Sequence, residues 1–393
     1  MASEIRRTDP KKRRTARRVR WGLLLTVLTS STILGLLHTK RSGSFWPVGV
    51  DALCPFGGLE SLNSLILNGT YLKKVEFGSL ALLIASVILV AIFGRSFCGR
   101  ICPLGTLQEI FGRLGRRFVP KHGPIPRWLD RPARFLKYGV LAVFILWTWR
   151  AGELVMRPYD PWAAYHHLTS SELMTELGVG AIILFAALIG SLLYDRFFCR
   201  YACPMGAFLA LGAKFSWFKV NRNAHTCIDC GACNTACPVA LEVANTTTLD
   251  SPECIACGEC IEACPVEDAL VVSDRRGFKI SSIMVTAFTF LIFFGIVALT
   301  TAAGSFEWSK TTLAQEVQRA GAGGGSVDTE SIKGWMSVDD IADATGLDPA
   351  EIAAPFGIAE DEYGIGLGEL KEARGFEMYA LREHVTALLS ESP

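Results

Sequence analysis

Histidine and methionine are scarce in this chain, and one haem-attachment motif is missing. The 393 residues include six histidines and seven methionines, and no Cys-x-x-Cys-His segment occurs. The sequence therefore excludes covalently attached haem of the c type. A haem bound through His38, His166 or His167 would be non-covalent, and we do not expect one. The shortage of imidazole and thioether ligands near the cysteines also argues against a copper site.

The chain also lacks an overall charge imbalance, since 39 basic residues nearly balance 38 acidic ones. The charges are instead segregated along the chain. Nine Lys or Arg fall in residues 1–20 and nine in 95–134, whereas residues 326–393 hold fifteen acids and four bases. A basic block directly before an apolar run usually fixes the orientation of a membrane protein. We therefore expect contact with membrane lipid and no nucleic-acid partner.

Apolar residues make up 50% of the chain, and its mean hydropathy is positive. Apolar runs of about twenty residues are long enough to cross a bilayer as helices. No clear small-residue cleavage signal follows the first run, so we expect it to be a retained span and not a signal peptide. Five runs are candidate spans: about 19–38, 77–95, 135–151, 178–195 and 282–303.

Eight of the thirteen cysteines fall into two copies of one pattern. The first copy, Cys-Ile-Asp-Cys-Gly-Ala-Cys-Asn-Thr-Ala-Cys-Pro, begins at Cys227, and the second, Cys-Ile-Ala-Cys-Gly-Glu-Cys-Ile-Glu-Ala-Cys-Pro, begins at Cys254. Three thiolates spaced by two residues bind one iron–sulfur cluster, and the fourth, which precedes proline, binds the other. A zinc site would leave the terminal Cys-Pro unexplained. We predict two [4Fe-4S] clusters, the first on Cys227, Cys230, Cys233 and Cys264 and the second on Cys254, Cys257, Cys260 and Cys237.

Four further cysteines belong to an internal repeat. Arg-Ser-Phe-Cys-Gly-Arg-Ile-Cys-Pro-Leu-Gly and Arg-Phe-Phe-Cys-Arg-Tyr-Ala-Cys-Pro-Met-Gly each follow an apolar run. Proline favours the first turn of a helix, so Cys102 and Cys203 are expected to cap new helices, whose N-termini lower a thiol pKa. Cys98, Cys102, Cys199 and Cys203 are then ligands of a further cluster, redox-active thiols or ordinary buried cysteines. The helix that follows Cys102 is expected to lie in the membrane interface plane or to pack against the spans.

Two weaker candidates lie away from these motifs. Cys54 stands in Cys-Pro-Phe-Gly-Gly-Leu, which resembles the segment at Cys102 and gives Cys54 a weak claim to a redox or ligand role. The segment 156–167 combines aromatic residues with His166, His167 and Asp160. Quinol oxidation needs a proton acceptor beside an apolar ring pocket, and histidine titrates near neutral pH. This segment is either a quinol site or an interfacial aromatic loop.

The expected fold is a mainly α membrane protein of about five transmembrane helices with an inserted two-cluster ferredoxin domain of α+β type. Two short helices capped by Ser337 and Asp348 indicate a small helical C-terminal domain. Its acidic charge opposes DNA binding and favours docking of a basic partner. The expected parts are a basic cytoplasmic tail (1–18), a four-helix membrane domain (19–220), the ferredoxin domain (221–281), a fifth transmembrane helix (282–303), a flexible linker (304–330) and an acidic helical domain (331–393).

Two Cys-x-x-x-Cys-Pro sites followed by a two-cluster ferredoxin block resemble the polyferredoxin-like membrane proteins of the NapH and NosR type. The resemblance covers roughly 20–300 and implies an electron-transfer subunit that passes electrons between the quinone pool and a redox partner protein or respiratory reductase. The charge pattern predicts a bacterial cytoplasmic membrane, with the N-terminus and ferredoxin domain on the cytoplasmic side and the acidic C-terminal domain outside, whereas NapH-type proteins end inside. The chain lacks the flavin-bearing outer domain of NosR-type proteins. A reductase for metal-cofactor assembly and a membrane redox sensor are the alternatives.

Overall fold

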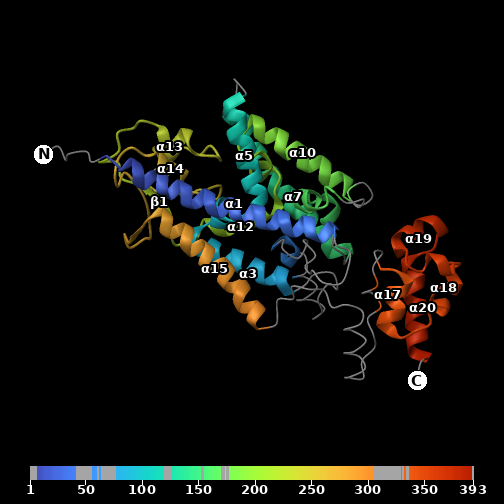
Figure 1. Cartoon of the computed structure of the whole chain (residues 1–393). Coiled ribbons are helices and arrows are strands. Elements are labelled where there is room, and N and C mark those ends of the chain that lie inside the picture. Colours follow the sequence, from blue (N-terminus) through green and yellow to red (C-terminus); the bar gives the residue numbers. More distant parts are fainter. Residues whose placement is uncertain are drawn as a thin grey trace. The chain divides into compact units, whose positions relative to one another are not determined.

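The computed structural model describes residues 7–40, 55–59, 62, 77–118, 126–151, 155–169, 173, 177–303, 329, 332 and 336–391. Within these ranges the chain is mostly helical (Figure 1). Residues 1–40 and 48–308 form one compact unit, and 41–47 with 309–393 form a second. Cys54 and most of the expected linker 304–330 lie outside the described residues.

Each internal repeat contains an apolar helix, a one-turn helix with the first cysteine, and a helix that starts at proline. The first repeat comprises α3 (Phe77–Phe93), α4 (Ser96–Arg100) and α5 (Pro103–Phe118), and the second comprises α10 (Gly178–Leu193), α11 (Phe197–Tyr201) and α12 (Pro204–Ala213). The helix caps expected from Cys-Pro are confirmed. The Gly105 amide donates to Cys102 Sγ at 3.5 Å, and the Gly206 amide donates to Cys203 Sγ at 3.3 Å.

The two repeats interlock. Helix α5 of the first repeat packs against α10 of the second, and α12 of the second packs against α3 of the first (Figure 1). Helix α12 also contacts α7 (Leu136–Ala151), which follows the short α6 (Arg127–Ala133). In α5 the buried side chains include Gln108 and Glu109, while Phe118 is exposed. Helix α5 therefore packs against the apolar helix of the other repeat, and its position in the interface plane stays a prediction.

Helix α1 (Pro10–Lys40) is longer than the span expected at 19–38. Its first turns do not form a separate tail. The Thr8 amide donates to the carbonyl of Pro265 at 3.0 Å, and Arg13 donates to the carbonyl of Cys264 at 3.1 Å. The basic segment that the sequence assigns to membrane orientation thus also binds the ferredoxin domain.

Only part of the five-span expectation is supported. Among the described residues, two helices are long and apolar enough to cross a membrane, α1 and α15 (Ser282–Ala302). Helices α3, α7 and α10 contain 17, 16 and 16 residues. They are close to the lower limit for a spanning helix. A multi-pass topology and its orientation remain predictions.

The ferredoxin domain is built on a small antiparallel sheet in the order β1 (Lys219–Arg222), β2 (Leu270–Ser273) and β3 (Lys279–Ile280). Lys219 pairs with Ser273 and Arg222 with Leu270, so the sheet closes the cysteine loops between its first two strands. The loops carry the short elements α13 (Ala232–Thr235), η3 (Val243–Asn245) and α14 (Glu259–Ala263). This domain packs in one apolar core with α3 and α15.

The second unit has its own apolar core, which includes Ile341, Ile352 and Leu381. The expected caps are present, because Ser337 Oγ accepts from the Asp340 amide and Asp348 Oδ1 accepts from the Ala350 amide. The helices of the unit are α17 (Val338–Thr345), α18 (Pro349–Ala353), η5 (Ala354–Phe356), η6 (Glu360–Glu362), α19 (Leu367–Arg374) and α20 (Met378–Glu391).

Candidate functional site

The two cysteine loops of the ferredoxin domain have the same backbone turns. Asp229 and Ala256, each two residues after the first cysteine of its copy, have φ of 50° and 49°. Gly231 and Gly258 are also left-handed, with φ of 69° and 84°. These matched turns direct successive cysteine side chains of each loop toward one space. The sequence duplication is therefore also a duplication of local structure.

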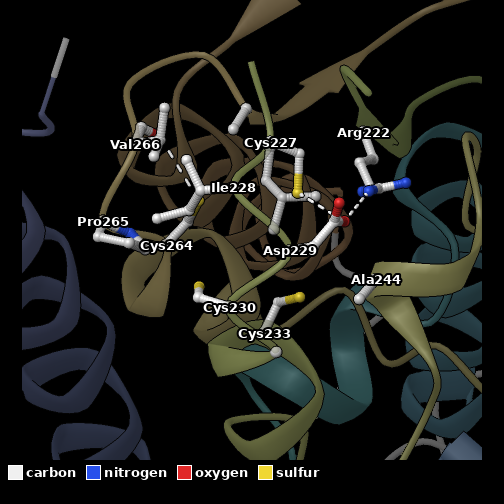
Figure 2. A pocket seen from close by; sticks show the side chains of 13 residues that line it. Arg222, Cys227, Ile228, Asp229, Cys230, Cys233, Ala244, Cys264, Pro265 and Val266 are labelled. Carbon is white, nitrogen blue, oxygen red and sulfur yellow. Dashed lines mark hydrogen bonds and ion pairs between the residues drawn. The ribbon is translucent and has the colours of Figure 1, made fainter. Parts of the chain in front are cut away.

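Cys227, Cys230, Cys233 and Cys264 line one pocket that is partly open to solvent. Figure 2 shows the four cysteines around this space, together with Asp229 and Arg222, which form an ion pair at its edge. The donor set is four thiols from two loops. A Cys₄ set is the one that [4Fe-4S] clusters take, so the residues present fit the first cluster.

The fourth cysteine of each copy approaches the other copy. Burial raises the pKa of the Cys260 thiol well above its usual range, and Cys257, Cys237 and Cys254 raise it further. Burial likewise raises the pKa of Cys264, with added contributions from Cys230 and Cys227. Cys237 thus shares a site with the second block. The assignment of the eight cysteines to two crossed ligand sets stays a prediction.

The two cysteine sets differ in exposure. Cys257 and Cys260 are each 7% exposed, whereas Cys230 of the first set lies at the surface. The buried set faces the first helical repeat, because the Arg100 guanidinium donates to the carbonyl of Ala256 at 2.8 Å. The first set is therefore the more accessible to another protein, and the second set is the one next to the helical repeats.

Gly99 is the point where the first repeat touches the buried cysteine loop. A Cβ added at Gly99 would overlap the carbonyl oxygen of Ile255 and lie 3.1 Å from the Cα of Cys257. Only glycine permits this approach, because it has no side chain. Cys98, the neighbour of Gly99, is consequently brought close to the ligands expected for the second cluster.

A buried ion network holds α1, both repeats and the ferredoxin domain together. Glu109 Oε2 lies 2.6 Å from Arg20 Nη2 and 2.7 Å from Arg196 Nη2. Arg20 Nη1 also lies 2.6 Å from Glu259 Oε1 on α14. Burial alone would raise the pKa of Glu109, but the guanidinium groups of Arg20 and Arg196 hold it well below its usual range. Glu109 is therefore an ionised carboxylate between two buried arginines.

Glu262 supplies a testable pH dependence. Burial raises its pKa to about 7, and Glu259 raises it while Arg20 and Arg100 oppose the change. Because the folded pKa lies above the unfolded value, the stabilisation is full below about pH 4.5 and is lost as the pH rises through about 7. Across this range we expect a loss of at most about 3 kcal/mol. Glu262→Gln, which cannot ionise, should flatten the decline of the apparent Tm between pH 5 and 8.

The measurement is anaerobic thermal unfolding in detergent at several pH values, with the exposed variant Asp268→Asn as control. Equal declines of Tm in the wild-type protein and in Glu262→Gln would show that Glu262 does not titrate in this interval.

The candidate quinol segment folds into η2 (Arg157–Tyr159) and α8 (Pro161–His166). Asp160 is the N-cap of α8, since its Oδ1 accepts from the Trp162 amide at 2.9 Å. His166 and His167 are 3% and 4% exposed, and the His166 ring lies 4.3 Å from the Trp162 ring, centroid to centroid. The structure brings His166 against the rings of Trp162 and Tyr165 and gives Asp160 a structural role as the helix cap.

Helix α1 connects this segment to the cysteines. A Cβ at Gly35 would overlap the imidazole of His166, and Arg20 donates to the carbonyl of Gly99 at 3.0 Å. Fifteen residues separate Arg20 from Gly35, which corresponds to about 22 Å along a helix. The histidine segment and the cysteine motifs therefore lie at opposite ends of the apolar part of α1.

The sequence analysis missed the buried charged residues as members of the site. Arg95 and Arg196 occupy the same position in the two repeats, three residues before the first cysteine, and are 1% and 0% exposed. Their matched spacing was visible, but basic residues after an apolar run were interpreted only as an orientation signal. Within the described residues, no three His, Cys, Asp or Glu side chains are grouped as ligands of a single metal ion.

Comparison with known proteins agrees with these motifs. A family model described as a 4Fe-4S binding domain matches residues 75–122 and again 177–224, and one described as a 4Fe-4S dicluster domain matches 219–265. The two matches of the first model coincide with the two membrane repeats, and the second covers most of the ferredoxin block. No solved structure matches the chain.

Three proteins of similar sequence have names that refer to electron transport, to ferredoxins or to regulation. YccM of Escherichia coli, whose name assigns it provisionally to electron transport, is 30% identical over 270 residues, covering 66% of this chain and 75% of YccM. The methylamine utilization ferredoxin-type protein MauN of Methylobacillus flagellatus is 26% identical over 237 residues, 56% of this chain and 77% of MauN. The regulatory protein NosR of Pseudomonas aeruginosa is 28% identical over 157 residues, 38% of this chain and 21% of NosR. The chain belongs to the family of polyferredoxin-like membrane proteins that carry [4Fe-4S] domains and transport electrons.

Proposed function

We propose that this protein carries electrons between the quinone pool and a partner redox protein through two [4Fe-4S] clusters in its ferredoxin domain. The first cluster would be held by Cys227, Cys230, Cys233 and Cys264, and the second by Cys254, Cys257, Cys260 and Cys237. The observation that carries the proposal is the contact of Gly99 with the Ile255–Cys257 loop. This contact joins the membrane repeat to the more buried cysteine set.

The clusters, when bound, supply one-electron exchange. The chain contributes the environment. Burial of Cys257 and Cys260 keeps water from the second site, while the surface position of Cys230 leaves the first site open to a partner. This asymmetry supports a path from the membrane through the second site to the first and outward, or the reverse.

At the quinone end, oxidation of one quinol to quinone releases two electrons and two protons. Two one-electron sites accept the electrons, and the protons need acceptors near the quinol. His166 or His167 is the proposed acceptor for a proton, since both are buried, His166 lies against the rings of Trp162 and Tyr165, and imidazole titrates near neutral pH. The Asp160 carboxylate accepts the Trp162 amide and would position the start of α8.

The proposed setting is a bacterial cytoplasmic membrane, with the ferredoxin domain and the N-terminus on the cytoplasmic side. The supporting features are the basic residues of α1 and the two spanning helices, α1 and α15. The acidic C-terminal unit would then lie outside and dock a basic partner, because opposite charges favour association.

The test is reduction of the anaerobically purified protein by a water-soluble quinol, followed by EPR of the ferredoxin clusters. We expect quinol-dependent cluster signals that fall strongly in His166→Gln and in His167→Gln, or in one of the two. Dithionite reduction of each variant provides the control for cluster content. Clusters that dithionite reduces but quinol does not, in the wild-type protein, would refute the quinone part of the proposal.

A further inference from the structure

We propose that Cys98, Cys102, Cys199 and Cys203 together hold one iron–sulfur cluster that the two repeats share, and that Arg95 and Arg196 balance its negative charge. The proposal rests on the electron-transfer function proposed above and adds a third redox centre between the membrane and the second ferredoxin cluster. It differs from a site in each repeat, because each half supplies only two cysteines.

The first support is the crossed packing of the repeats. Helices α5 and α12, which begin just after Cys102 and Cys203, each pack against the apolar helix of the other repeat. Cys102 and Cys203, which precede these helices, accordingly pack against the same apolar cluster, which includes Leu104 and Phe198. Neither repeat can build this arrangement alone.

The second support is that cysteines of both repeats pack together, because Cys98, Cys102 and Cys203 belong to one apolar cluster. Burial raises the pKa of Cys102, and Cys199 and Cys98 raise it further. Burial also raises the pKa of Cys203 well above its usual range, with contributions from Cys199, Cys98 and Cys102. The expectation that helix N-termini would lower these pKa values is therefore wrong, since burial and neighbouring thiolates outweigh the amide donors.

A cross-repeat hydrogen bond connects the halves directly. Gln108 of α5 donates through Nε2 to Cys199 Sγ at 3.2 Å, and its Oε1 accepts from the Cys199 amide at 3.2 Å. A side chain of the first repeat thus fixes a cysteine of the second. Such support of a ligand from outside the ligand set is common at metal sites.

The third support is the pair Arg95 and Arg196. Each of these arginines extends to the opposite repeat, as the helices that follow the Cys-Pro segments do. A Cβ at Gly105 would lie 2.8 Å from Arg196 Nη1, and a Cβ at Gly206 would lie 2.8 Å from Arg95 Nη2. Each arginine thus reaches the helix start of the opposite repeat, where glycine leaves room. Arg196 also donates to the carbonyl of Cys98 at 2.6 Å. Two buried guanidinium groups beside four cysteines make a site suited to an anion.

These features favour the cluster among the three interpretations left open by the sequence. Both arginines pair with carboxylates, Arg196 with Glu109 and Arg95 with Glu253, and each also reaches the cysteine segment of the opposite repeat. Four thiolates in a buried site repel one another and need cations. Iron supplies most of that charge in a Cys₄ cluster, and a Cys₄ set binds either a [2Fe-2S] or a [4Fe-4S] cluster. The arginines then offset the remaining negative charge.

The position of the site fits an intermediate step. Arg95 lies 3.4 Å from Glu253 Oε2, and Glu253 precedes Cys254 of the second ferredoxin set. Lys137 of α7 pairs with the same carboxylate. The shared site is therefore linked to the second cluster through Arg95 and Glu253, in addition to the contact at Gly99.

Iron and sulfide counting on the anaerobically purified protein decides the cluster content. Two ferredoxin clusters account for about eight irons, and a shared binuclear or tetranuclear cluster raises the total to about ten or twelve. Eight irons would overturn the proposal, and so would about sixteen, which means one cluster in each repeat. In Cys203→Ala the total should fall to about eight while the EPR signals of both ferredoxin clusters persist.

A second test measures the midpoint potential of the third centre in arginine variants. This test does not require a cysteine variant that folds. Arg95→Gln should keep the iron content and lower the midpoint potential of the third centre, because it removes a nearby positive charge. We expect a shift of at least about 59 mV, a tenfold change in the one-electron equilibrium constant. Arg18→Gln, an exposed change of equal charge on α1, should leave that potential unchanged. Equal effects of both variants would refute the role of Arg95.

The same samples distinguish failure of this proposal from failure of the quinone proposal. Eight irons with quinol-dependent reduction would refute the third centre and leave the quinone route standing. Additional irons with no reduction by quinol would support the third centre and refute the quinone route.

Discussion

Replacing Glu109 by alanine is expected to lower the free energy of unfolding of the membrane unit by about 3–5 kcal/mol. The carboxylate lies between Arg20 and Arg196, which are both 0% exposed, and its removal leaves two buried guanidinium groups without their shared partner. The free-energy cost of leaving a buried charge unpaired exceeds the net stabilisation from the ion pair. The reason is that no opposite charge then offsets the cost of removing the guanidinium from water. The apparent Tm in detergent should fall by about 10 °C.

The matched control is Asp250→Asn, which breaks a surface ion pair. Asp250 pairs with Lys219, and its side chain is 48% exposed. Exposed pairs contribute about 0–1 kcal/mol, so this variant should unfold close to the wild-type temperature. If Glu109→Ala and Asp250→Asn shift the Tm equally, the buried network does not hold α1 and the repeats together.

Gly99→Ala is expected to uncouple the ferredoxin domain from the first repeat. The added methyl group would overlap the carbonyl oxygen of Ile255, and backbone atoms cannot rotate away as a side chain can. The loop that carries Cys257 must shift, at a cost of about 1–3 kcal/mol for overpacking. We expect the iron content to stay while the rate of quinol-driven cluster reduction falls by about tenfold or more, equivalent to about 1.4 kcal/mol in the barrier.

Gly139→Ala provides the control for this variant. Gly139 is a helical glycine of α7, and a Cβ there would meet no atom within 4 Å. Alanine should stabilise that helix slightly, by up to about 1 kcal/mol, and leave the reduction rate unchanged. Stopped-flow reduction by quinol measures both variants, and a wild-type rate in Gly99→Ala would exclude the Gly99 contact from the electron path.

The sequence predicted the local features of this protein correctly where neighbouring residues determine them. The two cysteine loops, the Cys-Pro helix starts and the caps at Ser337 and Asp348 depend on backbone preferences and short-range hydrogen bonds. Iron–sulfur loops are recognised for the same reason, since the spacing of the thiols is fixed by the cluster. The family resemblance rested on these motifs and is confirmed.

Long-range packing decided what the sequence could not. The repeated arginines were visible as a pattern, but their burial and their crossing to the opposite repeat require the packing of α5 on α10 and of α12 on α3. The same holds for the first turns of α1, which bind the ferredoxin domain through Arg13 instead of ending as a tail. Charge along a chain indicates membrane orientation, whereas the partner of a buried charge depends on which helices meet.

The sequence by itself thus determined the cofactor type, the duplicated motifs and the membrane character, because each follows from residue type and spacing within a short segment. Only the tertiary structure determined that Gly99 contacts the second cysteine loop, that Cys98, Cys102 and Cys203 of the two repeats pack in one apolar cluster, and that α1 extends from the ferredoxin domain to His166. These arrangements depend on contacts between segments far apart in the chain, and no local pattern encodes them.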